Sequence, residues 1–368
     1  MLYYLSYLSE HFGPLRLFDY ITFRAGGAAA TAFLIVAIFG GKFAALLRSF
    51  NIRAAARYEG ILPEELLDKR KNSTPCMGGI LLIGAVLLAD LFWSKWHASN
   101  GINWILMGGT FGFALIGFLD DFLKVFHQKR DGLPGKLKLL GQFLIGGIVV
   151  WLFWKNPELN KIMRGFYIPF VKQPFQISAW YLLPVFSVAI IIVGSANAVN
   201  LTDGKDGLAS GCTIFCSLSY AVFTYLMGHK IFAGYLDLPY ISGIEEAVVF
   251  AAALGGGCVG FLWHNCHPAS MFMGDTGSLA LGGAIGMLAV LSRQELLLAL
   301  IGGVFVMEIV SVMIQVVSFK LTGKRVFLCS PIHHHFERKG WNETQIVVRF
   351  WILSGIFALM ALATLKLR

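Results

Sequence analysis

Three short segments of the chain each place aspartates at the edge of an apolar run. GFLDDFLK carries Asp120 and Asp121, NLTDGKDG carries Asp203 and Asp206, and FMGDTGS carries Asp275. Carboxylate oxygens without thiolate partners favour Mg²⁺, which fills its remaining coordination positions with water and phosphate oxygens. The three segments therefore predict a Mg²⁺ site that acts on a phosphate ester.

Basic side chains accompany these aspartates. Ammonium and guanidinium groups bind phosphate oxygens, and they also keep loops on the cytoplasmic side of a membrane, so both roles stay open here. The basic residues closest to the first aspartate pair, or in the loop before it, are Lys69, Arg70, Lys71, Lys124, Lys129, Arg130, Lys136 and Lys138.

A fourth polar segment, PIHHHFE, holds the consecutive histidines His333, His334 and His335. Neighbouring residues do not all converge on one metal ion, so contact with an anion or transfer of a proton is favoured over structural zinc. The alternative is a solvated loop.

The aspartate segments also have purely structural interpretations. Asp203 and Asp275 each stand before an apolar run, where a carboxylate can cap the N-terminus of a helix. The adjacent Asp120 and Asp121 are harder to explain by structure alone, because neighbouring carboxylates repel each other unless a cation or water relieves them.

The composition predicts that membrane helices position these segments. Of the 368 residues, 57% are apolar and 14% are charged, and the mean hydropathy of +0.68 lies outside the range of soluble domains. Continuous apolar runs favour helices over the alternating strands of a membrane barrel. We therefore expect an all-α polytopic integral membrane protein, with residues 1–368 forming a single transmembrane catalytic domain. No basic run interleaved with aromatic residues indicates a nucleic-acid partner.

Ten apolar segments are long enough, or nearly long enough, to cross a bilayer core of about 30 Å. They are Thr22 to Gly41, Met77 to Trp93, Ile102 to Leu119, Leu139 to Trp154, Ile177 to Asn200, Leu208 to Gly228, Ala247 to Trp263, Gly277 to Ser292, Leu296 to Phe319 and Ile346 to Leu365.

The distribution of charge predicts the orientation of these spans. More than half of the 30 Lys and Arg residues lie in the loops after odd-numbered spans. Basic loops stay in the cytoplasm, so we expect both termini outside it. All four polar segments fall in the odd-numbered loops, which places the active site on the cytoplasmic face. These loops are expected near residues 42–76, 120–138, 201–207, 264–276 and 320–345.

A transporter or channel is the rival of another class. Glu308 lies inside an apolar span, and GGGCVG makes span seven rich in glycine, so the two features could line a pathway. The other acidic residues cluster on one side, whereas a pathway would spread them across the depth of the membrane. Glu308 is left unassigned by the sequence.

Five segments, in chain order, resemble the signatures of the phospho-N-acetylmuramoyl-pentapeptide transferase family. They are RKNSTPCMGGI, GFLDDFLKV, NAVNLTDGKDGLASG, FLWHNCHPASMFMGDTGSLALGG and FLCSPIHHHFERKGW. The related polyprenyl-phosphate N-acetylhexosamine-1-phosphate transferases share the aspartate motifs and lack PIHHHFE. The resemblance runs nearly end to end.

The resemblance implies transfer of phospho-N-acetylmuramoyl-pentapeptide from UDP-MurNAc-pentapeptide to undecaprenyl phosphate. The expected products are lipid I and UMP, in a Mg²⁺-dependent step of peptidoglycan synthesis at the bacterial cytoplasmic (inner) membrane. A homodimer is also expected from the family. The alternative within the superfamily is transfer of GlcNAc-1-phosphate from UDP-GlcNAc to a polyprenyl phosphate.

The matched positions imply roles for single residues. Asp120 is the expected base or acceptor-positioning group, and Asp121 supports it near the metal. Asp275 is the expected principal Mg²⁺ ligand, with Asp121 and Asp203 as further ligands, and His333 and His334 are expected at the diphosphate or sugar. The expected substrate-binding residues are Lys71, Lys124, Lys138, Asn200, Asp203, Asp206, Asn265, Phe272 and His335. Of these, Asn265 and Phe272 are expected at the uracil.

Two positions depart from the family pattern. Lys205 stands where an apolar residue is typical, and could pair with an aspartate, reach a phosphate or point to water. Cys76 replaces a threonine and loses its hydroxyl.

The sequence leaves the reaction mechanism open. Direct attack by the lipid phosphate is favoured over a covalent aspartyl intermediate, because a phosphate monoester is already largely ionised near pH 7.

Overall fold

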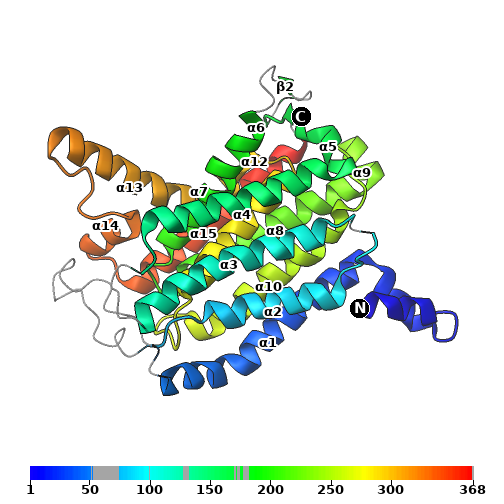
Figure 1. The fold of residues 1–368 in the computed structure, drawn as a ribbon, viewed down its shortest axis with the longest axis horizontal. Coiled ribbons are helices and arrows are strands. Elements are labelled where there is room, and N and C mark those ends of the chain that lie inside the picture. The colour runs from blue at the N-terminus through cyan, green and yellow to red at the C-terminus, as the bar shows by residue number, and fades with distance from the viewer. Residues whose placement is uncertain are drawn as a thin grey trace.

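The computed structural model describes residues 1–50, 52, 74–98, 100–126, 132–169, 171, 175–176 and 182–366. Within these ranges the chain forms a bundle of helices (Figure 1), nine of which are long and apolar enough to cross a membrane. They are α1 (Ile21–Ser49), α3 (Ile102–Phe126), α4 (Gly135–Lys155), the run Leu182–Thr202, α8 (Leu208–Gly228), α10 (Ala247–Asn265, extended by a 3-10 turn), α11 (Gly274–Leu291), α13 (Gly303–Thr322) and α15 (Glu343–Ala363). The prediction of an all-helical polytopic membrane protein is thereby confirmed.

Two of the ten predicted spans differ from simple crossing helices. The second is α2 (Gly79–Trp93), whose 15 residues make it shorter than the other nine. The fifth, Leu182–Thr202, is built from α6 (Leu182–Phe186), the π-helical turn η5 (Ser187–Ile192) and α7 (Val193–Thr202). Wide turns of this kind interrupt the regular hydrogen-bond ladder, and they are often found near functional sites.

The prediction of one continuous ninth span is wrong. The segment divides at Gly302 into α12 (Glu295–Ile301) and α13. A Cβ on the adjacent Gly303 would lie 2.5 Å from the Phe357 ring, so this corner also packs directly against α15. Hydropathy is continuous across the corner and therefore does not reveal it. Figure 1 shows α13 splayed outward from the bundle.

Helix α11 forms the centre of the bundle, with every one of its residues buried. It packs against α3, α7 and α2. Its approach to α2 is close, since a Cβ on Gly79 would lie 2.3 Å from the backbone nitrogen of Gly277. Two small residues thus fix the height at which the N-terminus of α11 sits beside α2.

The polar segments and the chain termini lie at opposite ends of the bundle (Figure 1). The N-terminal amine donates a hydrogen bond of 2.9 Å to the carbonyl of Phe92, at the far end of α2. Lys366, the last described residue, lies over the ring of Tyr235 at that same end. Both ends of the described chain therefore lie away from the polar segments, and the predicted orientation in the membrane stays a prediction.

Short elements complete the chain. Most of them lie at or near the end of the bundle that holds the chain termini: η1 (Leu2–Leu8), η2 (Gly13–Asp19), α5 (Pro157–Met163), the two-residue strands β1 (Gly165–Phe166) and β2 (Phe175–Gln176), α9 (Lys230–Tyr235), η6 (Ile244–Glu246) and η7 (Thr364–Lys366). The strands pair antiparallel. At the other end, α14 (Ile332–Arg338) lies between α13 and α15.

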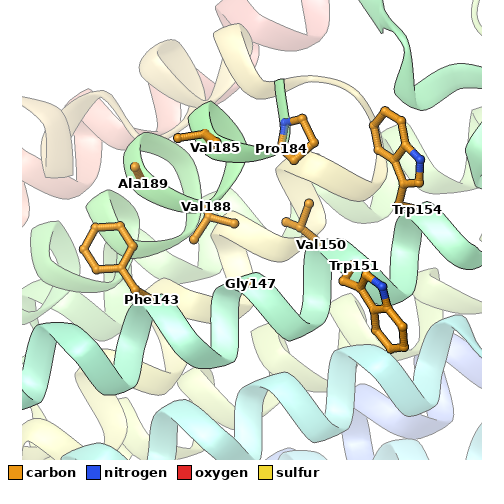
Figure 2. Close-up of a pocket in the computed structure, with 9 residues that line it drawn as sticks. All are labelled: Phe143, Gly147, Val150, Trp151, Trp154, Pro184, Val185, Val188 and Ala189. Atoms are coloured by element: carbon orange, nitrogen blue, oxygen red, sulfur yellow. The ribbon is translucent and has the colours of Figure 1, made fainter. Parts of the chain in front are cut away.

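An apolar groove of about 510 Å³ lies between α4 and the α6–η5 segment (Figure 2). Its lining residues are Phe143, Gly147, Val150, Trp151, Trp154, Pro184, Val185, Val188 and Ala189. None of these carries a charge or belongs to the polar segments. The groove therefore suits contact with hydrocarbon and not phosphate chemistry.

Candidate active site at one end of the helix bundle

The first aspartate pair lies inside a helix and not in a loop. The loop predicted at 120–138 is shorter at both ends, because α3 continues to Phe126 and α4 begins at Gly135. Asp120, Asp121 and Lys124 lie on the last two turns of α3. Asp120 and Lys124 are four residues apart, so both side chains lie on one face. Nζ of Lys124 lies 2.5 Å from Oδ2 of Asp120.

Two lysines join Asp120 to Asp275, which begins the central helix α11. Nζ of Lys124 lies 2.8 Å from Oδ2 of Asp275. Lys138, in the first turns of α4, lies 2.7 Å from Oδ2 of Asp275 and 3.3 Å from Oδ2 of Asp120. Two carboxylates that are nearly excluded from solvent thus share two ammonium groups, which relieves the repulsion between them.

Further hydrogen bonds orient the two carboxylates. Asn200, near the end of α7, donates from Nδ2 to Oδ1 of Asp275 at 2.8 Å and to Oγ of Ser278 at 2.8 Å. The backbone N–H of Leu133 donates to Oδ1 of Asp120 at 2.7 Å. The packing of four helices, α3, α4, α7 and α11, therefore brings together five predicted site residues, namely Asp120, Lys124, Lys138, Asn200 and Asp275.

Asp121 caps the N-terminus of α11. Its Oδ1 accepts the N–H of Asp275 at 3.0 Å, and its Oδ2 accepts both the N–H and the hydroxyl of Thr276, at 2.9 and 2.7 Å. Gly274 has a φ of +75° and leaves room for this carboxylate, since a Cβ there would lie 2.7 Å from Oδ2 of Asp121. Asp121 thus holds the helix that presents Asp275. Its expected role beside a metal stays a prediction.

The loop NLTDGKDG joins α7 to α8, as predicted. Asp203 follows the last residue of α7 and is partly exposed. Oδ2 of Asp206 accepts the N–H of Ala269 at 3.2 Å and lies 3.1 Å from Nδ1 of His267. Among the described residues, Asp206, His267 and Glu343 offer ligand atoms within 4.8 Å of one another. This group is separate from the predicted Mg²⁺ ligands.

Among the described residues, Lys205 pairs with glutamates and not with an aspartate, and it is buried from water. Its Nζ lies 2.5 Å from Oε1 of Glu337 and 4.0 Å from Oε2 of Glu343, and the side chain is only 5% exposed. The three roles considered from the sequence omitted this one, because Glu337 is 132 residues away along the chain. The ion pair between Lys205 and Glu337 joins the α7–α8 loop to α14, the helix that carries the three histidines.

Of the two residues expected at uracil, Asn265 ends α10 and Phe272 lies in the connection between α10 and α11. Asn265 is buried, and its Oδ1 accepts bonds from the N–H of Gly207 at 3.0 Å and the hydroxyl of Ser210 at 3.2 Å. Its Nδ2 donates to the carbonyl of Met271 at 3.0 Å. The side chain thus ties two segments together. Phe272 is held through its backbone N–H, which donates to the carbonyl of Pro75 at 2.8 Å.

His333 and His334 lie buried in α14, a short helix within the loop predicted near 320–345. Nδ1 of His333 lies 3.1 Å from Oε2 of Glu308, close enough for an ion pair. The atoms are not aligned as a hydrogen bond, and neither side chain has a hydrogen-bond partner among the described residues. A Cβ on Gly204 would lie 2.6 Å from Nε2 of His333, so the NLTDG loop covers this ring.

His334 and His335 have different partners. Nδ1 of His334 lies 2.9 Å from Oε2 of Glu337. Burial lowers the pKa of His334 below its usual value, although the hydrogen bond to Glu337 opposes this. Nδ1 of His335 accepts the backbone N–H of Leu328 at 3.1 Å and so holds the preceding loop. Of the three histidines, the structure therefore buries two beside carboxylates.

The remaining sequence predictions are placed as follows. Lys71 lies outside the described residues. Cys76 lies beside the start of α11, with its sulfur 3.1 Å from where a Cβ of Gly274 would be. Glu337 was not singled out from the sequence, although it stands inside the quoted motif PIHHHFE. Its position three residues after His334 on a helix was the available signal.

Comparison with known proteins adds family information to this geometry. The model of glycosyl transferase family 4 matches residues 103–293. The chain is 47% identical over 374 residues to a phospho-N-acetylmuramoyl-pentapeptide-transferase of Methylacidiphilum infernorum (isolate V4), with both chains fully covered. Proteins of the same name from Dinoroseobacter shibae and Ruegeria sp. (strain TM1040) are 46% and 45% identical, again over the whole of each chain.

Proposed function

This chain belongs to the phospho-N-acetylmuramoyl-pentapeptide-transferase family, and from that premise we propose its substrates. The donor is UDP-MurNAc-pentapeptide and the acceptor is undecaprenyl phosphate. The products are lipid I and UMP. The observation that carries this proposal is the similarity at 45–47% identity over the full chain to relatives of that name.

The site offers the charge pattern that this transfer needs. An oxygen of the lipid phosphate attacks the sugar-linked phosphorus of the donor, and the bond between that phosphorus and the oxygen of UMP breaks. Negative charge gathers on the phosphate oxygens, and fixed cations stabilise it. Lys124 and Lys138 are placed to supply this positive charge. The hydrogen bonds from Asn200 to Asp275 and from the N–H of Leu133 to Asp120 fix the orientation of the two carboxylates.

The carboxylate pair fits Mg²⁺, which we propose as the cofactor. Oδ2 of Asp120 and Oδ2 of Asp275 face the same two ammonium groups, so this place already attracts positive charge. Carboxylate oxygens are ligands that Mg²⁺ prefers. Asp275, with Asp120 beside it, would hold the ion, which when bound neutralises phosphate charge. The lysines would then turn toward phosphate oxygens.

Asp120 does not need to remove a proton for direct attack. A phosphate monoester is largely ionised near pH 7, so positioning and charge neutralisation carry the reaction. The two ion pairs of Asp120 keep its carboxylate in a fixed place beside Asp275. This arrangement supports a one-step transfer.

The proposed setting is the bacterial cytoplasmic membrane, with the site facing the cytoplasm. The nucleotide donor is soluble and the acceptor is a lipid, so the reaction must occur at a membrane surface. The site lies at one end of the described helices, where Lys and Arg are most frequent in the connecting loops. Both termini lie at the opposite end (Figure 1).

Identification of the lipid product tests the proposal. The full-length protein in detergent is supplied with undecaprenyl phosphate, Mg²⁺ and UDP-MurNAc-pentapeptide, and the lipid extract is analysed by mass spectrometry. The expected product has the mass of undecaprenyl-diphosphoryl-MurNAc-pentapeptide. A lipid product formed only from UDP-GlcNAc would assign the protein to the sister transferases instead.

A further inference from the structure

His334 is joined to the α7–α8 loop through two charged side chains. Its Nδ1 lies 2.9 Å from Oε2 of Glu337, on the same short helix. The other oxygen of Glu337, Oε1, accepts a hydrogen bond of 2.5 Å from Nζ of Lys205. A direct line of contacts therefore runs from NLTDGKDG to PIHHHFE.

This line of contacts is largely shielded from water. The side chains of Lys205, His334 and Glu337 are 5%, 7% and 18% exposed. Burial raises the pKa of Glu337, but the hydrogen bonds from His334 and Lys205 outweigh it and lower that pKa to about 2. Glu337 is therefore an ionised carboxylate at neutral pH, and an ionised carboxylate only accepts hydrogen bonds.

The protonation of His334 follows from its partner. Burial lowers its pKa below the ordinary value, so the ring is neutral at pH 7. Because Glu337 can only accept, the single ring proton lies on Nδ1, and Nε2 is the acceptor nitrogen. An acceptor nitrogen binds a hydroxyl group and not a phosphate oxygen, which is itself an acceptor.

We propose that Glu337 and Lys205 are positioning residues of His334, and that they present its Nε2 as an acceptor for a hydroxyl group of the sugar nucleotide. The ligand part of this inference rests on the proposed function, since it needs a sugar nucleotide at this end of the bundle. Glu337 fixes the tautomer and the orientation of the ring. Lys205 keeps Glu337 charged and in place.

A purely structural role for Lys205 is the alternative, in which it only fastens the loop to α14. The two roles differ in how charge acts on His334. Among the described residues, the charged and titratable groups near His334 are Glu337 on its own helix, Lys205 from the α7–α8 loop and His333 beside it, followed by Glu308 of α13 and Glu343 of α15.

Removal of the two partners should shift the titration of His334 in opposite directions. Lys205→Met removes a cation, so the protonated ring becomes more stable and its midpoint rises by roughly half a pH unit. Glu337→Gln removes the anion that favours the protonated ring, so the midpoint falls by a similar amount. Loosening of the fold would expose the ring in both variants, and both midpoints would then rise together.

The test follows ¹⁵N spectra of full-length protein with labelled histidines, in detergent, across pH. The signal missing in His334→Gln identifies the ring. The set comprises the wild type, Lys205→Met, Lys205→Arg and Glu337→Gln. Lys161→Met is the matched control, because it breaks an exposed lysine–glutamate pair at the opposite end of the bundle, where Nζ of Lys161 lies 3.4 Å from Oε2 of Glu158. We expect an Nδ1–H ring in the wild type, opposite shifts in the two disrupting variants, and wild-type behaviour in Lys205→Arg and Lys161→Met.

Kinetics complete the test. At pH 7, Lys205→Met and Glu337→Gln should each lower kcat/KM for UDP-MurNAc-pentapeptide roughly tenfold, with Lys205→Arg close to the wild type. An Nε2–H tautomer in the wild type, or shifts in one direction, would overturn the positioning role. A wild type that releases no UMP would overturn the proposed function, while the ring signals would still decide the positioning.

Discussion

Nζ of Lys124 lies 2.8 Å from Oδ2 of Asp275, although the two residues are 151 positions apart in the chain. The contact exists because the end of α3 meets the beginning of α11. The same ammonium group binds Asp120 one turn earlier on α3. The Lys124 ammonium therefore binds one carboxylate on α3 and one on α11. The site depends on the packing of these two helices against each other.

Loss of this cation should remove transferase activity. In Lys124→Met, Asp120 and Asp275 keep Lys138 as their one shared lysine among the described residues, and the phosphate groups lose one fixed charge. We expect kcat/KM to fall by roughly a hundredfold or more. Lys136→Met is the control, since Lys136 is an exposed neighbour of Lys138. Equal effects of the two substitutions on UMP release would contradict a specific role for Lys124.

Asp275→Asn should abolish turnover in a folded protein. The amide keeps the shape of the side chain and can still accept a hydrogen bond from Asn200, but it loses the charge that favours Mg²⁺. Asp237→Asn, at the other end of the bundle, should behave as the wild type. The readouts are UMP release and elution as a single species in detergent. Near-normal activity of Asp275→Asn would rule out its role as the metal ligand.

Asp121 should matter more for stability than Asp120 does. Asp121→Asn places an NH₂ group against the N–H donors of α11, so a donor faces donors. Asp120→Asn loses charged contacts with lysines, but it gains by removing the repulsion between Asp120 and Asp275. We expect Asp121→Asn to lower the free energy of unfolding by about 2 kcal/mol. Thermal unfolding in detergent measures the difference. A larger loss in Asp120→Asn would contradict the capping role.

Acid should weaken the contacts of α14. The pKa of His334 lies below its usual 6.5, and that of Glu337 lies at about 2, below its usual 4.5. In both cases the unfolded chain binds more protons, so stability is lost as pH falls, first below about 6.5 through His334 and then below about 4.5 through Glu337.

Substitution of His334 isolates the first part of this pH dependence. The drop in thermal midpoint between pH 7 and pH 5.5 should be smaller in His334→Gln than in the wild type. His11→Gln, an exposed position at the other end of the molecule, serves as the control. An unchanged drop in His334→Gln would show that the histidine carries no such linkage.

Gly204 should not tolerate a side chain. A Cβ there would lie 2.6 Å from Nε2 of His333, and the buried ring has little room to move. Gly204→Ala should cost about 1–3 kcal/mol of stability. Gly41→Ala is the control, since a Cβ at Gly41 meets no atom within 4 Å. Equal unfolding midpoints in the two variants would show that the loop does not cover His333 closely.

Hydropathy and charge predicted most of the fold. Continuous apolar runs are the main signal of a membrane helix, so nine of the ten spans have a long apolar helix among the described residues. The ends were less accurate where helices carry charge. Asp120 and Asp121 suggested a loop, but their charges are met by lysines and by the N-terminus of α11, so α3 continues to Phe126.

Contacts between distant parts of the chain could not be predicted from local pattern. The sequence grouped Asp120 with Asp275 through their shared side of the membrane and the family resemblance, and it gave no sign that Lys205 would bind Glu337. Glu308 was left unassigned, and the structure places it beside His333. The amide of Asn265, expected at uracil, is occupied by Gly207, Ser210 and Met271. Packing of several helices decides each of these contacts.

The release of UMP by the full-length protein in detergent tests the central claim most directly. Undecaprenyl phosphate is the acceptor, and UDP-MurNAc-pentapeptide and UDP-GlcNAc are compared as donors, each with Mg²⁺ and with EDTA. We predict release from the muramyl donor alone, with complete loss in EDTA. Release from UDP-GlcNAc alone, or from neither donor in folded protein, would contradict the proposed transfer, and undiminished release in EDTA would contradict the Mg²⁺ site at Asp275.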